Sequence, residues 1–439
     1  MEDPSFQQAF LSPLNSTTNV PAHHILTGSF RSMPLFLLAF TPISRKLNWV
    51  QTIQGFGPHQ YLAKTNVKLR DGHETRVYAT SWAWPPELSS WAVDRGRIDA
   101  NEVKWSVRNV DRTPITAISS YISVPPPYTR IYSVGGPTGE VHTIDENSGG
   151  FGSKLQEVLF VGETNLEKAD KTRVALRYGS HGVELTPSLK YAFIPVLGTN
   201  TIEMYSHETF SGRLTHLASV PSPRGAAAKD GPRHVKIHPN GKILYSVTEH
   251  NNYVDAYRIH STTLEYISSK TLVPENLHDP NHHKFRGDTL MLPRSTSSSP
   301  IPRYLVTTTR GANPSIRGWL SIFALDDDGL FINDVTRVER YETPTSGGKA
   351  NAIDLLPKAI SASDNETSDG VWILLTDDDD STAAPGGTGA VRVLEWDGWA
   401  TGGVKVVTEW PEGSPLVQVE DREASDEKIQ GASHAIWLD

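Results

Sequence analysis

The fold is indicated by two similar stretches, 182–200 (GVELTPSLKYAFIPVLGTN) and 234–252 (HVKIHPNGKILYSVTEHNN). The second repeats the pattern of the first at an offset of 52 residues. Each copy has the pattern of strand, turn, strand and turn, and the second is followed by two more strand-like stretches, 254–260 (VDAYRIH) and 264–272 (LEYISSKTL). Four strands in about 50 residues is the size of one β-propeller blade, which buries its faces only against neighbouring blades. The matched pairs are Val183 with Val235, Leu185 with Ile237, Pro187 with Pro239, Lys190 with Lys242 and Asn200 with Asn252.

The rest of the chain continues this pattern. Beyond the first residues, short apolar runs are separated by Gly, Pro, Asn and Asp with almost no sustained helical periodicity, which is typical of an all-β protein. We therefore predict a seven-bladed β-propeller of four-stranded antiparallel blades, as a single domain over 22–439 that follows a flexible tail at 1–21. Insertions are expected near 84–126, with a short helix near 89–93, and near 358–370. A large β-sandwich or two barrels are the alternatives.

The composition limits the classes of function. The chain has 439 residues, a formal net charge of −9 and no cysteine. The negative charge argues against a general binder of nucleic acid or anionic membranes, although a few convergent arginines could still bind a small anionic substrate. Disulfides, thiolate metal sites and a cysteine nucleophile are excluded.

The longest apolar run does not predict export or membrane insertion. This run, 33–40 (MPLFLLAF), is too short to span a bilayer, and only Arg31 precedes it as a fixed positive charge. A signal peptide is therefore not expected, and we expect a cytoplasmic protein. Formation of a homo-oligomer is left open.

The sequence 239–242 (PNGK) predicts a tight hairpin, because Asn and Gly adopt the positive φ angles that a two-residue turn requires. With the central Asn-Gly pair as the turn, Arg233 is expected opposite Thr248. Glu249 is then opposite Pro232. Arg233 and Glu249 should therefore lie close together at the open end of the hairpin.

The repeat places two more ionisable residues at the same end. The offset of 52 gives His181 the position in its blade that Arg233 has in the next one. The stretch 304–311 (YLVTTTRG) matches the apolar pattern of the second hairpin strand, which places Arg310 on the position of Glu249. If these strands are the innermost ones of three consecutive blades, the four side chains converge on the central channel.

These residue types suit acid–base chemistry on an anion. Two guanidiniums can each bind a carboxylate with two hydrogen bonds. A histidine or glutamate can move a proton near neutral pH when its surroundings adjust its pKa. The alternative is a structural ring of ion pairs that closes the channel. His234 is a further substrate-binding candidate, although its alternation with apolar residues also fits a packing role, as does that of His238.

Two other polar clusters are weaker candidates. The set His278, Asp279, His282 and His283 could bind a metal, but its spacing fits no standard ligand pattern and a solvated loop is favoured. The acidic run 377–380 could bind a cation, but a solvated turn is favoured. The sequence contains no phosphate-binding loop, nucleophile elbow, His-Glu-x-x-His motif or dinucleotide fingerprint. No cofactor or metal is therefore expected.

The stretches 231–235 (GPRHV), 238–242 (HPNGK) and 244–249 (LYSVTE) resemble the seven-bladed lactonase family, which includes bacterial 6-phosphogluconolactonase and fungal 3-carboxy-cis,cis-muconate cyclase. The fungal cyclases are the closer likeness, which is clearest after residue 175 and faint between 45 and 125. The stretches similar to the cyclases are 23–28 (HHILTG), 180–182 (SHG), 343–348 (TPTSGG), 351–352 (NA) and 435–439 (AIWLD). The active-site residues proposed for the cyclases lie in motifs that match His181, Arg233, Glu249 and Arg310.

The resemblance implies a cycloisomerase that forms a lactone by adding a carboxylate of an unsaturated acid to a double bond of the same molecule, in fungal aromatic catabolism or a related specialised pathway. Arg233 and Arg310 are expected to hold substrate carboxylates and to offset charge in an enolate-like transition state. His181 is slightly favoured over Glu249 as the proton donor. The alternatives are a hydrolytic lactonase, a cyclase acting on a neutral or larger substrate, and a non-catalytic binding propeller.

Overall fold

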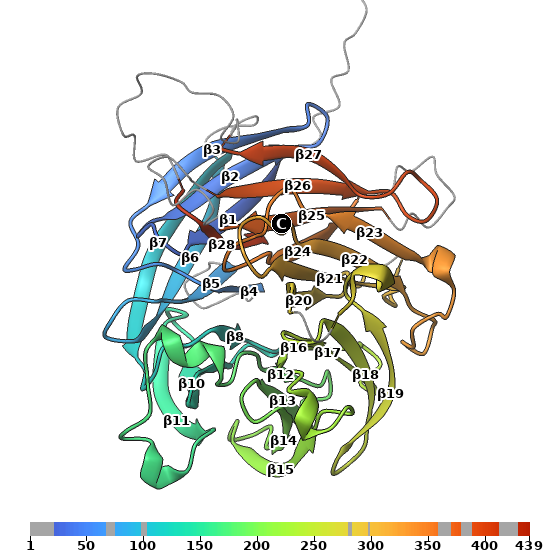
Figure 1. Cartoon of the computed structure of the whole chain (residues 1–439). Helices are drawn as coiled ribbons and strands as arrows, with labels where there is room; N and C mark the ends of the chain where they lie inside the picture. Colours follow the sequence, from blue (N-terminus) through green and yellow to red (C-terminus); the bar gives the residue numbers. More distant parts are fainter. Residues whose placement is uncertain are drawn as a thin grey trace, which may run out of the picture.

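The structure is a computed structural model that describes residues 22–66, 75–97, 103–279, 283–296, 299–358, 370–378, 389–411 and 429–439. These residues form seven antiparallel sheets of four strands each, arranged as blades around one axis (Figure 1). The predicted seven-bladed, all-β propeller is confirmed. The predicted tail at 1–21 and nearly all of the predicted insertion at 358–370 lie outside the described residues.

In six blades the strands follow one another in chain order, from the inner strand beside the axis to the outer strand at the rim (Figure 1). The first three of these blades contain β4 (Leu62–Asn66), β5 (Thr75–Thr80), β6 (Glu87–Arg97) and β7 (Val103–Pro114); β8 (Tyr121–Ser123), β9 (Arg130–Gly135), β10 (Thr138–Ile144) and β11 (Phe151–Leu159); and β12 (Glu184–Leu185), β13 (Tyr191–Val196), β14 (Thr201–His207) and β15 (Leu214–Pro221). The other three contain β16 (Pro232–Ile237), β17 (Ile243–Thr248), β18 (Tyr253–Ile259) and β19 (Leu264–Thr271); β20 (Phe285–Met291), β21 (Tyr304–Gly311), β22 (Trp319–Ala324) and β23 (Val338–Glu342); and β24 (Ile353–Pro357), β25 (Val371–Asp377), β26 (Ala390–Trp396) and β27 (Lys405–Trp410).

Helical structure in the described part of the chain is limited to five short 3₁₀ turns. They are η1 (Glu163–Asn165), η2 (Arg173–Arg177), η3 (Ala226–Ala228), η4 (Glu275–Leu277) and η5 (Val335–Arg337). No helix among these residues has the length and apolar character needed to cross a membrane.

The seventh blade closes the ring with strands from opposite ends of the sequence. Its inner strand pairs antiparallel with β1, so that Ile25 faces Trp437 and Thr27 faces Ala435. This pairing leaves no open edge between the first and last blades. The strands of this blade are β28 (Ala432–Trp437), β1 (His23–Ser29), β2 (Leu35–Thr41) and β3 (Lys46–Ile53).

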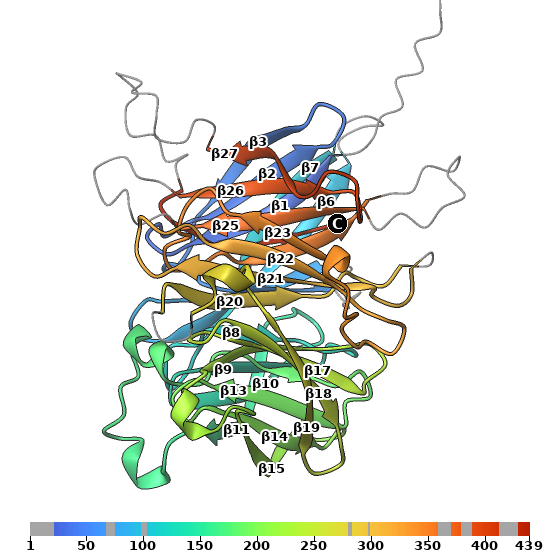
Figure 2. The same ribbon diagram turned by 45° about the vertical axis from the view of Figure 1, so that its right-hand side comes forward.

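Apolar side chains between adjacent blades form the core, and Figure 2 shows neighbouring blades stacked as sheets. Every residue of β17 and β21 is buried, because these strands have another blade on each side. The prediction of a short helix near 89–93 is wrong, since these residues lie in β6. With β7, β6 forms the outer half of a regular blade rather than an insertion at 84–126. Residues 88–93 are all buried, and a short buried run cannot be distinguished from a helix by periodicity.

Trp437 tests how much the closing blade contributes to stability. Its side chain is fully buried, in a cluster with Phe40 and Trp372. We expect Trp437→Ala to lower the free energy of unfolding by about 3–5 kcal/mol, because the truncation leaves a cavity. The control is Trp49→Ala on β3, where the residue is 39% exposed and the expected change is about 0.5 kcal/mol or less. Urea unfolding followed by circular dichroism measures both variants, and equal losses would contradict the prediction.

Candidate active site

A β-bulge interrupts the pairing of the inner strand β16 with β17. His234 lies opposite Val247, as the predicted register requires, but Pro232 lies opposite Thr248. Arg233 is therefore the extra residue of the bulge. The expected pairing of Arg233 with Thr248 is wrong, because the turn sets the register only as far as the bulge.

The next blade has an irregularity at the equivalent place. The register of β20 with β21 shifts between Gly287 and Leu290, so Asp288 lies in the irregular step. Bulges redirect side chains and are common beside active sites. Arg233 and Asp288 meet across the two blades, with 3.1 Å between Arg233 Nη2 and Asp288 Oδ1.

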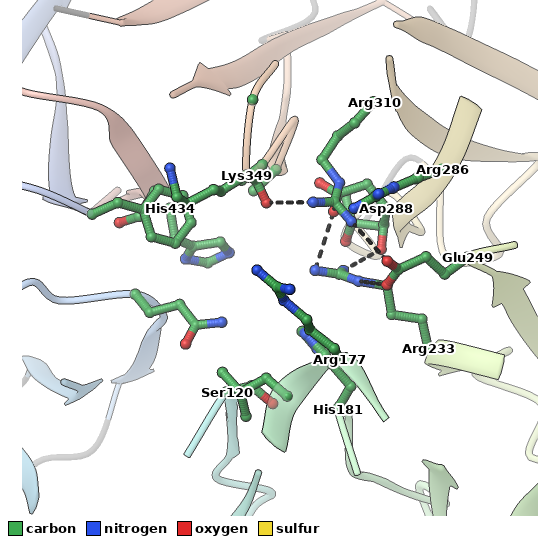
Figure 3. Close-up of a pocket in the computed structure, with 18 of the residues that line it drawn as sticks. Ser120, Arg177, His181, Arg233, Glu249, Arg286, Asp288, Arg310, Lys349 and His434 are labelled. Atoms are coloured by element: carbon green, nitrogen blue, oxygen red, sulfur yellow. Dashed lines mark hydrogen bonds and ion pairs between the residues drawn. The ribbon is translucent and has the colours of Figure 1, made fainter. Parts of the chain in front are cut away.

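Four side chains form a closed set of ion pairs, the ionic quartet of Arg233, Glu249, Asp288 and Arg310 (Figure 3). Glu249 Oε2 lies 3.2 Å from Arg233 Nε, and its Oε1 lies 3.3 Å from Arg310 Nη2. Asp288 Oδ1 lies 3.1 Å from Arg310 Nε. All four side chains are nearly buried, and the two carboxylates offset the charge of the two guanidiniums.

Backbone hydrogen bonds hold the quartet between the two blades. Glu249 N donates to Gly231 O at 2.8 Å, and Gly287 N donates to Glu249 O at 2.9 Å. Asp288 Oδ2 accepts from Asn351 N at 2.8 Å. Burial alone would raise the pKa of Glu249, but Arg310 and Arg233 outweigh burial and hold this pKa below its ordinary value. Glu249 is therefore an ionised carboxylate and a poor proton donor.

Two buried histidines lie against the quartet. His181 Nδ1 lies 3.3 Å from His234 Nε2, and His234 Nδ1 lies 3.3 Å from Thr289 Oγ1. Burial, reinforced by the charge of Arg233, lowers the pKa of both imidazoles well below the ordinary value, so both are neutral. Arg233 Nη1 lies 3.2 Å from His234 Nε2 and 3.4 Å from its Nδ1, so the guanidinium can donate to either ring nitrogen. A neutral imidazole has one unprotonated ring nitrogen, so His181 can accept a proton.

A pocket of about 490 Å³ lies over the quartet, with His181, His234 and His434 also in its wall. Arg173 and Arg177 reach it from η2, and Figure 3 shows Arg177 pointing into its middle. The sequence-predicted residues His181, Arg233, His234, Glu249 and Arg310 are therefore brought together at one end of the ring.

The pocket carries more positive than negative charge. Lys349 pairs with Asp378 at 3.0 Å, whereas Arg177 and Arg286 form no ion pair with any residue that the structure describes. Arg286 is the cross-strand partner of Arg310. Arg173 likewise has no ion pair among the described residues, and because the quartet is balanced, Arg173, Arg177 and Arg286 supply the surplus charge. The sequence analysis missed these three arginines, along with Asp288 and His434, although pairing β20 with β21 would have placed Arg286 beside Arg310.

The two weaker clusters have structural contacts. His278 Nε2 lies 2.8 Å from Asn251 O, and His282 lies outside the described residues. The expectation of a solvated acidic turn at 377–380 is wrong for its first two residues, which are buried. Asp377 pairs with Arg392, and Asp378 pairs with Arg31 and Lys349, while 379 and 380 are not described. The described residues contain no group of three or more potential metal-binding side chains.

Residues 31–345 match the family described as lactonases with a seven-bladed β-propeller. The chain belongs to this lactonase family. Muconate cycloisomerase 1 of Cutaneotrichosporon cutaneum is 31% identical over 346 residues, which is 76% of this chain and 84% of that protein. Carboxy-cis,cis-muconate cyclase of Neurospora crassa is 28% identical over 213 residues, 46% of this chain and 50% of the cyclase. A 6-phosphogluconolactonase of Yersinia pestis is 28% identical over 155 residues, 35% and 41% of the two chains.

The resemblance to the lactonase family is thereby confirmed. Two of these relatives are named as a cycloisomerase and a cyclase, and the third is named as a lactonase. Membership of the lactonase family does not by itself fix the direction of the reaction, because one fold and one site can serve different reactions.

Two buried histidines make the stability of this lactonase-family protein depend on pH. Burial lowers the pKa of His59 and of His434 to about 4, whereas the value in an unfolded chain is about 6.5. The unfolded state therefore binds more protons between these values. Stability is complete above about pH 6.5 and is lost as the pH falls toward 4, by up to about 3 kcal/mol for each histidine.

Urea unfolding at about pH 7.5, 5.5 and 4.5 measures this loss. The variant His59→Gln should reduce the slope of stability against pH, because one of the buried histidines no longer titrates. His216→Gln is the matched control, since His216 is 48% exposed on the outer strand β15. A stability that does not change over this range would contradict the prediction.

Proposed function

We propose that this protein is a cycloisomerase that forms a lactone from an unsaturated di- or tricarboxylic acid. One carboxylate oxygen attacks the β-carbon of a double bond conjugated to another carboxyl group, and a C–O bond forms. The electron pair of the double bond moves toward that carboxyl group, and a proton then adds at the α-carbon. The overall change takes up one proton and requires no oxidant or reductant. The observation that carries the proposal is the position of the buried His181 beside the ionic quartet, in a pocket whose surplus positive charge suits a polycarboxylate.

The arrangement of charges divides the binding of the substrate between two sets of arginines. Arg233 and Arg310 were expected to hold the substrate carboxylates, but Glu249 and Asp288 already pair with them. We assign the capture of the anion to Arg177 and the neighbouring cations at the opening of the pocket. The two guanidiniums of the quartet then act at the reacting end, where their positive charge offsets negative charge as it moves toward the carboxyl group.

The proton is best supplied by His181. Its imidazole is neutral in the free protein because it is buried and lies near Arg233. A bound substrate with two or more negative charges counteracts that arginine and favours the imidazolium form. The imidazolium can then give its proton to the α-carbon, which restores the neutral side chain. Glu249 cannot replace it readily, because two arginines hold it ionised.

A hydrolytic lactonase is the second candidate, and the neutral state of His181 favours it. The unprotonated ring nitrogen of a neutral imidazole can remove a proton from water that attacks a lactone carbonyl. A second cavity of about 490 Å³ shares Arg177, Glu249 and Arg286 with the main pocket. This extra space and its basic lining also suit a larger, phosphorylated lactone.

The reaction is tested by following the ultraviolet absorbance of 3-carboxy-cis,cis-muconate with the purified protein. We expect the absorbance of the diene to disappear, and kcat to fall by about 10²–10⁴-fold in His181→Ala, because the proton donor is lost. The exposed His216 on β15 provides the control, and His216→Ala should keep full activity.

Two other outcomes would contradict the proposed cyclase activity. Hydrolysis of 6-phosphogluconolactone without loss of the diene would replace it with the hydrolytic lactonase. No turnover of either compound by the folded protein would contradict both and leave a binding propeller. The proposal that this protein acts in the breakdown of aromatic compounds depends only on the cyclase reaction.

Arg286→Gln tests the capture of the anion. This change should raise KM for the carboxylate substrate by about 10–100-fold, because a hydrogen bond to a charged group contributes about 1.5–3 kcal/mol. The value of kcat should change little, since Arg286 lies at the opening of the pocket. Arg258→Gln on β18, where the side chain is 46% exposed, is the matched control. An unchanged KM, or a KM that does not depend on salt in the wild type, would count against this role.

A further inference from the structure

His434 projects into the pocket from the strand that closes the ring. It lies on β28 and is 6% exposed. Figure 3 shows its ring on the opposite side of the pocket from Glu249 and Arg233. The residue is thus separate from the quartet and from His181, and the function proposed above does not use it.

Neighbouring residues fix the orientation of this imidazole. Its ring stacks on Tyr61 with 4.2 Å between the ring centres, and Tyr61 stacks in turn on Tyr121 at the same distance. Thr27 Oγ1 donates to His434 O at 3.2 Å, which ties the backbone to β1. The side chain therefore has one position, and it does not have to be ordered when a ligand binds.

The hydrogen bonds of His434 also define which nitrogen carries the proton. Leu62 N donates to Nδ1 at 3.3 Å, so Nδ1 is an acceptor and the proton of the neutral ring lies on Nε2. Burial keeps the ring neutral, although Asp354 and Asp288 act in the opposite direction. None of the described protein atoms accepts a hydrogen bond from Nε2. A nearly buried donor therefore faces the pocket without a protein partner.

We propose that His434 is a further catalytic residue, which donates a hydrogen bond from Nε2 to the substrate oxygen on which negative charge develops. In the cyclisation this is an oxygen of the conjugated carboxyl group, and in a hydrolysis it is the carbonyl oxygen of the lactone. The proton stays on Nε2 throughout, so no bond of His434 forms or breaks. The catalytic part of this proposal rests on the proposed function.

A neutral donor suits this position for an electrostatic reason. A preorganised donor contributes most where charge appears only in the transition state, because it then stabilises that state more than the bound substrate. The cations at the opening attract the substrate before the reaction as well as during it. His434 adds no net charge, so its contribution grows only as the oxygen becomes more negative.

Two substitutions separate the donor from the packing of the ring. His434→Asn places an amide oxygen where Nδ1 accepts from Leu62 N, but it removes the donor at Nε2. His434→Gln places an amide N–H near Nε2. We expect kcat to fall by about 10²–10³-fold in the Asn variant with KM nearly unchanged, and the Gln variant to recover at least about 10-fold of that loss. Equal losses in both variants, with equal decreases in melting temperature, would show a packing role and overturn the proposal.

A second measurement does not depend on turnover. The full chain labelled with ¹⁵N-histidine should show a neutral His434 with its proton on Nε2 from about pH 5.5 to 8, assigned by the loss of its signals in His434→Asn. Propane-1,2,3-tricarboxylate, which has no double bond, should shift the Nε2 signal. An imidazolium, or a proton on Nδ1, at neutral pH would overturn the proposal even in an active enzyme. A shift with the tricarboxylate in a protein that turns over neither substrate would contradict the proposed function but support the donor.

Discussion

The ion pairs of Arg233 and Arg310 with Glu249 and Asp288 connect two neighbouring blades at the end of the ring where the pocket opens. Removing four charged groups from water is costly, and such a set persists only when each charge has several partners. The irregular strands β16 and β20 give each of these charges several partners. The bulge in β16 presents Arg233, and the irregular step in β20 presents Asp288, so that each carboxylate contacts both guanidiniums.

The balance of charge in the quartet determines the state of the groups around it. The positive charge of Arg233 adds to the effect of burial and keeps His181 and His234 neutral. Both arginines keep Glu249 ionised. His181, whose ordinary pKa is near neutrality, is therefore a base in the free protein. Glu249 is ionised and is therefore not available as an acid. Residue type alone does not indicate either state, because each depends on which charges lie within a few ångströms.

The repeat in the sequence predicts both the fold and part of the site. An offset of 52 residues between two blades places His181 and Arg233 at equivalent positions, and the structure brings both into one pocket. A repeat describes what blades have in common, whereas Asp288 lies where a blade departs from the regular register. His434 comes from the strand that pairs the two ends of the chain, and Arg177 from a 3₁₀ turn between blades. None of these positions follows from the repeat, because each requires the closed ring.

The charge of the ligand then decides how the same residues act. A ligand with several carboxylates brings negative charge into a region where the inner groups are balanced and only the opening is positive. That charge favours protonation of His181, which in the proposed cyclisation then acts as an acid toward carbon. A neutral ester supplies no such charge, so His181 remains a base toward water. The role proposed for His434 is the same in both cases, because negative charge develops on an oxygen whichever way the lactone ring is made or opened. A difference in substrate charge alone can therefore separate lactone formation from lactone hydrolysis at one set of side chains.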